Sequence, residues 1–295
     1  MELIRDLYAR RPAGRPVFSF EFFTPKTPEG DRSLFERTLP ALAATGPGYC
    51  SVTYGAGGST RDKTLGMVER IQNEFRIPGM AHLTCVGSTR AEITSLLEDA
   101  RRRGIRNILA LRGDPPAGTA AFVPTEGGFR YAHELVTLAR DFGGLSVGVA
   151  GFPEGHLECR EGKEVDWERL RAKIACGADF VVTQLFFDNA YFYEFREALT
   201  RRLGVTVPII PGIIPILGAG QIRKFVALCG ATIPPGLARQ LDEHAHDDAA
   251  VVELGIEYAT AQCADLLRQG VPGIHFYTLN KAASTVRIIQ QLGLA

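Results

Sequence analysis

The feature that most constrains the fold is a regular alternation of short apolar runs with amphipathic stretches along the whole chain. The apolar runs are rich in Val, Ile, Phe or Tyr and are bounded by Gly, Pro or Asn, which is typical of strands. Several are almost continuously apolar, as strands covered on both faces are. The expected strands are Val17–Phe23, Tyr49–Tyr54, Gly79–Val86, Asn107–Arg112, Leu145–Phe152, Phe180–Phe187, Val207–Ile213 and Ile274–Leu279.

The amphipathic stretches that follow these runs are predicted to be helices. Thr89–Arg103 shows the pattern best, because Thr89 can cap the helix, Glu92 stands at the capping-box position and Gly104 can end it. Residues 233 to 270 contain no expected strand and are predicted to form extra helices between the seventh helix and the eighth strand. The other expected helices are Asp31–Ala44, Arg61–Phe75, Tyr131–Asp141, Asp166–Cys176, Ala190–Leu203, Ala219–Cys229 and Lys281–Gln291.

Eight strands, each followed by a helix, predict an α/β fold of the (β/α)₈ TIM-barrel type. A doubly wound open sheet is the alternative that the same pattern allows. The chain has 295 residues, without a low-complexity linker or a break in composition, and we expect a single barrel domain over residues 1–295.

Composition and charge narrow the class of protein. The chain is 45% hydrophobic and 22% charged, as soluble proteins are. Its formal net charge of zero argues against nucleic acid or an anionic membrane as the main partner. The first residues lack the apolar core of a signal peptide, and no stretch approaches the roughly 18 apolar residues of a membrane span. We therefore expect a cytoplasmic protein, with its six widely spaced cysteines as reduced thiols.

In a barrel of this type the active site forms at the carboxyl ends of the strands. Glu21 stands in the first expected strand within the aromatic run Phe18–Phe23. Removing a carboxyl group from water raises its pKa, which suits a general acid near neutral pH. An outward-facing glutamate on a half-exposed strand fits the pattern equally well.

Other polar groups stand at the ends of the next strands. A glycine-rich turn, Thr53–Thr60, can approach a phosphate but matches neither the dinucleotide fingerprint nor the P-loop. Each group alone has a structural explanation, such as a core histidine or a surface ion pair. Their coincidence on successive strand ends indicates a site. The further groups are His82, Arg112, Asp114, His156 and Gln184.

His244 and His246 are the one pair that suggests a metal. Their i, i+2 spacing does not place both imidazoles on one face of a helix. We expect them to be solvated, and no metal site is predicted.

Several of these runs together resemble the motifs of the methylenetetrahydrofolate reductase family. They are spread from residue 18 to residue 280, and the length is similar to that of the bacterial form, a catalytic barrel without a regulatory domain. The runs are Phe18–Phe23, Ser51–Ala56, Ala81–Cys85, Leu109–Asp114, Thr183–Asp188, Ile209–Ile213 and His275–Asn280.

This resemblance implies a (β/α)₈ barrel with non-covalent FAD and ping-pong chemistry. NADH or NADPH would give hydride to the flavin and leave, and the reduced flavin would then convert 5,10-methylenetetrahydrofolate to 5-methyltetrahydrofolate. The acid glutamate of the family falls on Glu21, and its flavin-tuning aspartate falls on Asp114. The resemblance also implies a homo-oligomer, a dimer or a tetramer.

The same matching implies two sets of binding residues. Flavin-binding positions fall on Thr53, Tyr54, Ala56, His82, Arg112, Gly113, Asp114, Ala132, Phe152, His156, Asp166 and Lys173. Substrate positions fall on Gln184, Gln221, Phe225, Tyr277 and Lys281. The chain departs from the family at Phe152, where Tyr is frequent, at Ala172, where a relative has Arg, and at Lys281, where Arg is usual. Lysine can pair with a folate carboxylate but lacks the bidentate fork of arginine.

Two other classes of protein remain as alternatives. A flavin subunit that receives electrons from a redox partner protein is compatible with the same residues. A barrel lyase or aldolase would need a lysine or metal ligands on its strands, and the expected strands contain no lysine. The sequence does not choose between NADH and NADPH.

Overall fold

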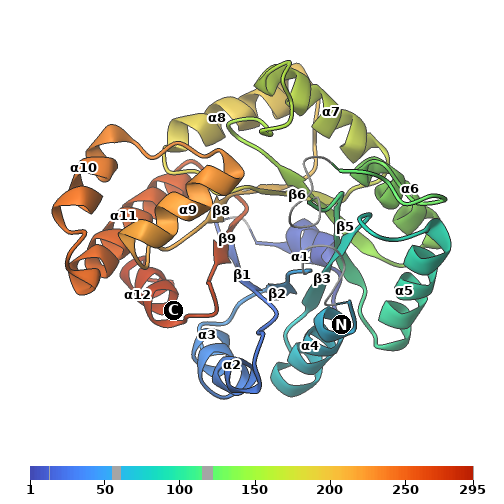
Figure 1. The fold of residues 1–295 in the computed structure, drawn as a ribbon, viewed down its shortest axis with the longest axis horizontal. Coiled ribbons are helices and arrows are strands. Elements are labelled where there is room, and N and C mark those ends of the chain that lie inside the picture. The colour runs from blue at the N-terminus through green and yellow to red at the C-terminus, as the bar shows by residue number, and fades with distance from the viewer. Residues whose placement is uncertain (13, 55–60, 115–121, 295) are drawn as a thin grey trace.

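The computed structural model describes residues 1–12, 14–54, 61–114 and 122–294. Within them nine parallel strands form one sheet in the order β7-β6-β5-β4-β3-β2-β1-β9-β8 (Figure 1). The strands are β1 (Val17–Phe22), β2 (Tyr49–Val52), β3 (Gly79–Thr84), β4 (Asn107–Leu111), β5 (Ser146–Gly151), β6 (Phe180–Thr183), β7 (Ile209–Ile210), β8 (Gly212–Ile213) and β9 (Gly273–Tyr277).

The sheet closes on itself through β7 and β8. Ile210 in β7 pairs with Val182 in β6, and Gly212 in β8 pairs with His275 in β9. Pro211 separates the two strands because it has no N–H to donate to a strand ladder. The expected continuous strand Val207–Ile213 is therefore wrong, since this segment changes partner at the proline. The (β/α)₈ barrel is confirmed, and the open sheet is excluded.

Helices surround the strands, as Figure 1 shows. They are α2 (Pro28–Ser33), the π-helix η1 (Leu34–Thr38), α3 (Leu39–Ala43), α4 (Arg61–Phe75), α5 (Arg90–Arg102), α6 (Ala132–Phe142), α7 (Lys163–Ala175), α8 (Asn189–Glu197), the π-helix η3 (Ala198–Arg202), α9 (Ala219–Cys229) and α12 (Ala283–Gln291). The extra helices expected in 233–270 are confirmed as α10 (Pro235–Glu243) and α11 (Asp248–Arg268).

Local sequence explains where these helices begin and break. Thr89 and Glu92 form the predicted capping box at the start of α5. The expected helix Asp31–Ala44 is instead interrupted by a π turn. Pro40 lacks the N–H that a continuous α-helix would use at that position. The helix expected from Lys281 begins two residues later, at Ala283.

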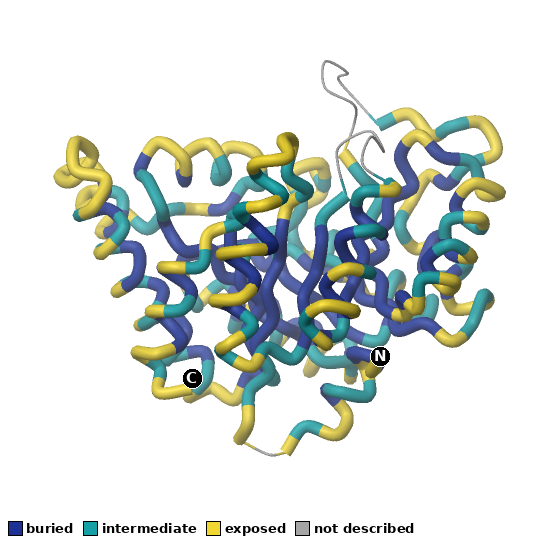
Figure 2. Tube along the Cα trace, turned by 90° about the horizontal axis from the view of Figure 1, so that it is seen from below, coloured by how far each residue is buried: buried dark blue, intermediate teal, exposed yellow. Residues whose placement is uncertain are grey.

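The amino-terminal helix α1 (Ile4–Arg10) was not expected from the sequence. Its residues Ile4 and Tyr8 belong to an interior cluster at the amino-terminal end of the strands. The described strand residues of this cluster are Tyr49, Met80, Leu109, Phe180, Val182 and Ile210. Figure 2 shows the buried strands inside a shell of helices whose outer faces are exposed. The lower barrel, at the amino-terminal ends of the strands, is thus filled by apolar side chains. The upper barrel, at the carboxyl ends of the strands, is left for polar side chains.

None of the helices in the described ranges is both long and apolar enough to cross a membrane.

Candidate active site

The upper interior of the barrel is lined by polar side chains. Successive side chains of a strand alternate between its two faces, so Ser19 and Glu21 of β1 share the inner face. The register places Glu21 beside Ser51 of β2 and Tyr277 of β9, and places Ser19 beside His275. These residues lie toward the mouth, the end of the barrel formed by the carboxyl ends of the strands. The inward orientation of Glu21 is confirmed, since only 7% of the residue is exposed.

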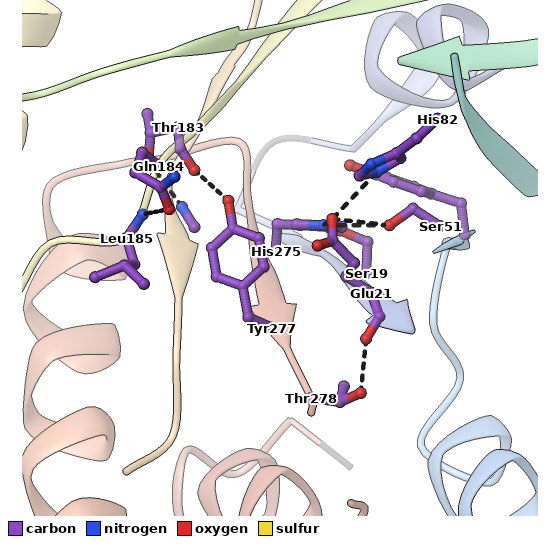
Figure 3. A network of polar contacts seen from close by, with 12 residues as sticks. Ser19, Glu21, Ser51, His82, Thr183, Gln184, Leu185, His275, Tyr277 and Thr278 are labelled. Atoms are coloured by element: carbon purple, nitrogen blue, oxygen red, sulfur yellow. Dashed lines mark hydrogen bonds and ion pairs between the residues drawn. The ribbon is translucent and has the colours of Figure 1, made fainter. Parts of the chain in front are cut away.

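Three polar groups converge on one oxygen of Glu21 (Figure 3). Ser51 Oγ donates to Glu21 Oε2 at 3.3 Å, and His275 Nε2 lies 3.2 Å from the same oxygen. His82 Nε2 is also 3.2 Å from Oε2, but without the alignment of a hydrogen bond. In the described residues, the other oxygen, Oε1, has no hydrogen-bond partner. One oxygen is thus anchored in the barrel and the second remains available.

The electrostatics of Glu21 correct the expectation of a raised pKa. Burial does oppose ionisation of the carboxyl group. The nearby His82 and the hydrogen bond from His275 outweigh burial, and together they hold the pKa of Glu21 well below its ordinary value. Glu21 is therefore a carboxylate in this arrangement, and it can act as an acid only after it takes up a proton.

His275 is fully buried and is positioned from both sides. Its Nδ1 lies 2.7 Å from Ser19 Oγ, and its ring stacks on Tyr49 with centroids 6.0 Å apart. An ionised carboxylate only accepts hydrogen bonds, so Nε2 carries a proton at its contact with Glu21. The sequence analysis did not assign a role to Ser19, Ser51 or His275. The alternation of inward side chains along β1 is the signal that identifies Ser19.

Within the described residues, polar atoms near neighbouring strand ends are buried without a hydrogen-bond partner. They are Tyr54 Oη, His82 Nε2 and Thr84 Oγ1. Such atoms are costly in a protein interior unless a ligand or water satisfies them. At Gly113, which has φ of +87°, an added Cβ would lie 2.7 Å from Val86 Cγ1, so only glycine fits without displacing that side chain. Ala56 lies outside the described residues.

A second group of charged residues lies at the ends of β4 and β5 and at the start of α7. Arg112 forms a bidentate ion pair with Glu158. His156 N donates to Asp166 Oδ2 at 3.2 Å. Lys173 Nζ donates to Ala150 O at 2.9 Å. The charges of Asp166, Arg112 and Asp114 all act on the pKa of His156, so these predicted flavin positions lie near one another.

Burial has different effects on the ionisable groups of this cluster. It lowers the pKa of Lys173 to about 8, although Asp166 acts in the opposite direction. It also raises the pKa of Asp166, against the attraction of His156 and Lys173. Burial disfavours the charged form of this lysine, and an anion bound beside it would stabilise that charge. This side of the mouth therefore suits a phosphate-bearing ligand.

The remaining predicted flavin positions lie outside this cluster of ion pairs and hydrogen bonds. Asp114 is exposed just after β4, and Thr53 follows β2, where its carbonyl accepts a hydrogen bond from Thr64. Ala132 is the first residue of α6. The ring of Phe152 meets the edge of His156 with centroids 4.6 Å apart, and it has no hydroxyl to offer a ligand.

The predicted substrate positions lie at the end of β6, on α9 and at the end of β9, with Gln184 next to the end of β5. Gln184 Oε1 accepts from Leu185 N at 2.8 Å, and Gln184 shares a small cavity with Phe152. Tyr277 Oη donates to Thr183 O at 2.5 Å. Phe225 is half-buried on α9. Of these groups, Tyr277 lies beside Glu21 as its partner in the register of β1 and β9.

Two of the predicted substrate residues take no part in the hydrogen bonds described above. Gln221 and Lys281 are exposed, and neither side chain makes a hydrogen bond within the described part of the chain. Lys281 lies in the turn after β9, where Leu279 and Asn280 both have positive φ. His244 and His246 are exposed, as expected. Over the described residues, no group of three His, Cys, Asp or Glu is placed to hold a metal ion.

Comparison with protein families gives a match over most of the chain. Residues 5–293 match the family model described as methylenetetrahydrofolate reductase. Methylenetetrahydrofolate reductase (NADH) 1 of Arabidopsis thaliana is 40% identical over 304 residues, which are 100% of this chain and 51% of the relative. The 5,10-methylenetetrahydrofolate reductase of Escherichia coli (strain K12) is 36% identical over 282 residues, 95% of this chain and 92% of that protein. The chain thus spans about half the length of the plant relative and most of the bacterial one.

A solved structure supports the fold independently. It is an uncharacterized protein from Clostridium thermocellum that binds two copies of 5-methyl-5,6,7,8-tetrahydrofolic acid. It superimposes with a TM-score of 0.63, at 18% identity, over 99% of both chains. At this identity the likeness concerns the barrel alone.

Proposed function

Because the chain belongs to the methylenetetrahydrofolate reductase family, we propose that it reduces 5,10-methylenetetrahydrofolate to 5-methyltetrahydrofolate through bound FAD. The family match and relatives named as methylenetetrahydrofolate reductases support an oxidoreductase of this type. We favour NADH as the hydride donor, since the name of the plant relative specifies it. The observation that carries the proposal is the buried Glu21 at the mouth, with one oxygen anchored and the other without a partner among the described residues.

The residues of the mouth fit a flavin. Tyr54 Oη, His82 Nε2 and Thr84 Oγ1 are buried without partners, as groups that hydrogen-bond a polar ring system would be. Arg112 and Lys173 supply the positive charge that two phosphates require. When bound, FAD would accept a hydride from the nicotinamide and later deliver it to the folate.

The reaction adds one hydride and one proton to the substrate. The proton goes to the nitrogen that leaves the methylene carbon when the five-membered ring opens, and this C–N bond breaks. We assign delivery of the proton to Glu21, through the oxygen that the barrel leaves free. Folate bound over the mouth would exclude water from Glu21, which favours the protonated carboxyl group.

Other residues would bind the folate or stabilise its charge rather than transfer the proton. Ring opening leaves a cationic iminium on the substrate, and a carboxylate such as Asp114 at the mouth can stabilise that charge. Gln184 and Tyr277 would hold the pterin. Phe225 offers a ring face for stacking against the folate.

Reconstitution of the purified chain with FAD tests this proposal. The protein should become yellow, lose its colour with NADH in the absence of oxygen, and regain it with methylenetetrahydrofolate. A chain that cannot bind FAD contradicts the proposal. If dithionite bleaches the flavin but neither NADH nor NADPH does, the result would instead support the alternative of a flavin subunit that receives electrons from a redox partner protein.

A further inference from the structure

Each of the three guanidinium nitrogens of Arg112 already has a partner among the described residues. Its Nη1 lies 2.5 Å from Glu158 Oε2, and its Nη2 lies 2.9 Å from Glu158 Oε1. Its Nε donates to Gly113 O at 3.2 Å. Arginine binds carboxylate and phosphate through the same bidentate fork. Glu158 therefore occupies the donors that a flavin phosphate would use.

The ion pair is built into the loop between β5 and α7. Glu158 N donates to His156 Nδ1 at 3.1 Å, and His156 N in turn donates to Asp166 Oδ2. His156 and Asp166 are themselves flavin positions, so the loop presents Glu158 from within the cofactor side of the mouth. The pairing lowers the pKa of Glu158 and raises that of Arg112. Both groups are therefore charged over the physiological pH range.

The two partners differ in how easily they can separate. The side chain of Arg112 is 22% exposed, whereas that of Glu158 is 51% exposed. A carboxylate that is half in water can turn outward at small cost, because water replaces its partner. The less exposed arginine would stay in place for a new anion.

We propose that Glu158 is a stand-in for the cofactor phosphate: it holds Arg112 before the cofactor binds and is displaced when FAD binds. This inference rests on the proposed function. Its consequence is a lower affinity for FAD, since binding must break the Arg112–Glu158 pair and bring phosphate close to a like charge. The native carboxylate thus sets the affinity of the site below what the cations alone would give.

The variant Glu158→Gln tests the proposal, with Glu161→Gln as its matched control. Glu161 lies in the same loop but pairs with Arg169 at 2.5 Å, so its replacement removes the same charge without freeing Arg112. The dissociation constants of FAD and riboflavin are measured by flavin fluorescence at low and high salt. Riboflavin has the ring system but no phosphate.

We expect E158Q to lower the dissociation constant of FAD by about twofold to fivefold at low salt, the range of an exposed ion pair. The gain should shrink at high salt, which screens the competing charges. Riboflavin binding should not change, and E161Q should bind FAD like the wild type. In an Arg112→Gln background, the gain from E158Q should be smaller, because only the repulsion between Glu158 and the phosphate remains to be relieved.

Two outcomes overturn the inference while leaving the proposed function intact. FAD binding that E158Q leaves unchanged or weakens, relative to E161Q, means that Glu158 does not compete with phosphate. An equal gain for riboflavin means that the variant acts on the ring pocket. Failure of the wild-type chain to bind any flavin, with melting curves showing folded protein, overturns the proposed function as well.

Discussion

The two oxygens of Glu21 have different surroundings, and this difference assigns them different tasks. Oε2 is held by Ser51 and His275 and lies beside His82. Oε1 has no hydrogen-bond partner among the described residues. The aromatic run around Glu21 indicated an unusual carboxylate. It could not indicate the lowered pKa, because that depends on imidazoles 61 and 254 positions away.

Replacing Glu21 by Gln should separate the two half-reactions. The variant should keep FAD and accept hydride from NADH at the wild-type rate, because that step needs no proton from the protein. Reoxidation of the flavin by methylenetetrahydrofolate should slow by about 10²–10⁴-fold, the contribution of a general acid. Stopped-flow absorbance of the flavin measures both rates, and normal reoxidation would remove Glu21 from the proton step.

Glu21 should also make stability depend on pH. Its pKa in the folded state is below that of the unfolded chain. Its contribution to the free energy of unfolding is therefore present above about pH 4.5 and is lost as the pH falls below that value. Glu21→Gln should cost about 1–3 kcal/mol at pH 6, and the difference should shrink by pH 3. Urea unfolding at the two pH values measures this, and a constant difference would refute the assigned pKa direction.

Lys173 should show a trade-off between stability and cofactor binding. In the folded protein its pKa is about 8, below that of a free lysine, so the charged form is disfavoured by folding. Without cofactor, the free energy of unfolding should rise between about pH 8 and pH 10, and Lys173→Met should remove this rise. The same variant should bind FAD more weakly. Thermal melts across this pH range and a flavin titration check both effects.

At the scale of elements, the alternation of apolar runs with amphipathic stretches predicts most of the barrel, because several strands are almost continuously apolar. It fails where one residue changes the hydrogen bonding, as Pro211 does between β7 and β8. It also fails for α1, which has only seven residues and no side-chain cap. The interior role of α1 becomes visible only when the strands surround it.

The role of α1 can be tested by Ile4→Ala. Ile4 is completely buried in the lower barrel, and its N–H donates to Asn107 Oδ1 at 2.8 Å. The truncation leaves a cavity, and we expect it to lower the free energy of unfolding by about 2–5 kcal/mol. Chemical denaturation measures the change, with the exposed Glu2→Ala as control. If the free energy of unfolding falls no more than it does in the control, the packing of α1 in the barrel does not stabilise the fold.

At the scale of the whole molecule, closure of the barrel makes the distant motifs into one site. Residues from Glu21 in β1 to Tyr277 in β9 meet at one mouth because all strands run in the same direction. Convergence of the strand ends was predictable from this topology. The placement of Gln221 and Lys281 was not, since exposed side chains on a helix and a turn depend on a ligand to position them. The oligomeric state stays a prediction.

The most direct test of the proposed activity is an anaerobic experiment on the isolated chain reconstituted with FAD. One equivalent of NADH should bleach the flavin, and methylenetetrahydrofolate added afterwards should restore its absorbance and yield an equal amount of 5-methyltetrahydrofolate. Reduced flavin that methylenetetrahydrofolate fails to reoxidise, or reoxidation without the methyl product, would contradict the proposed function.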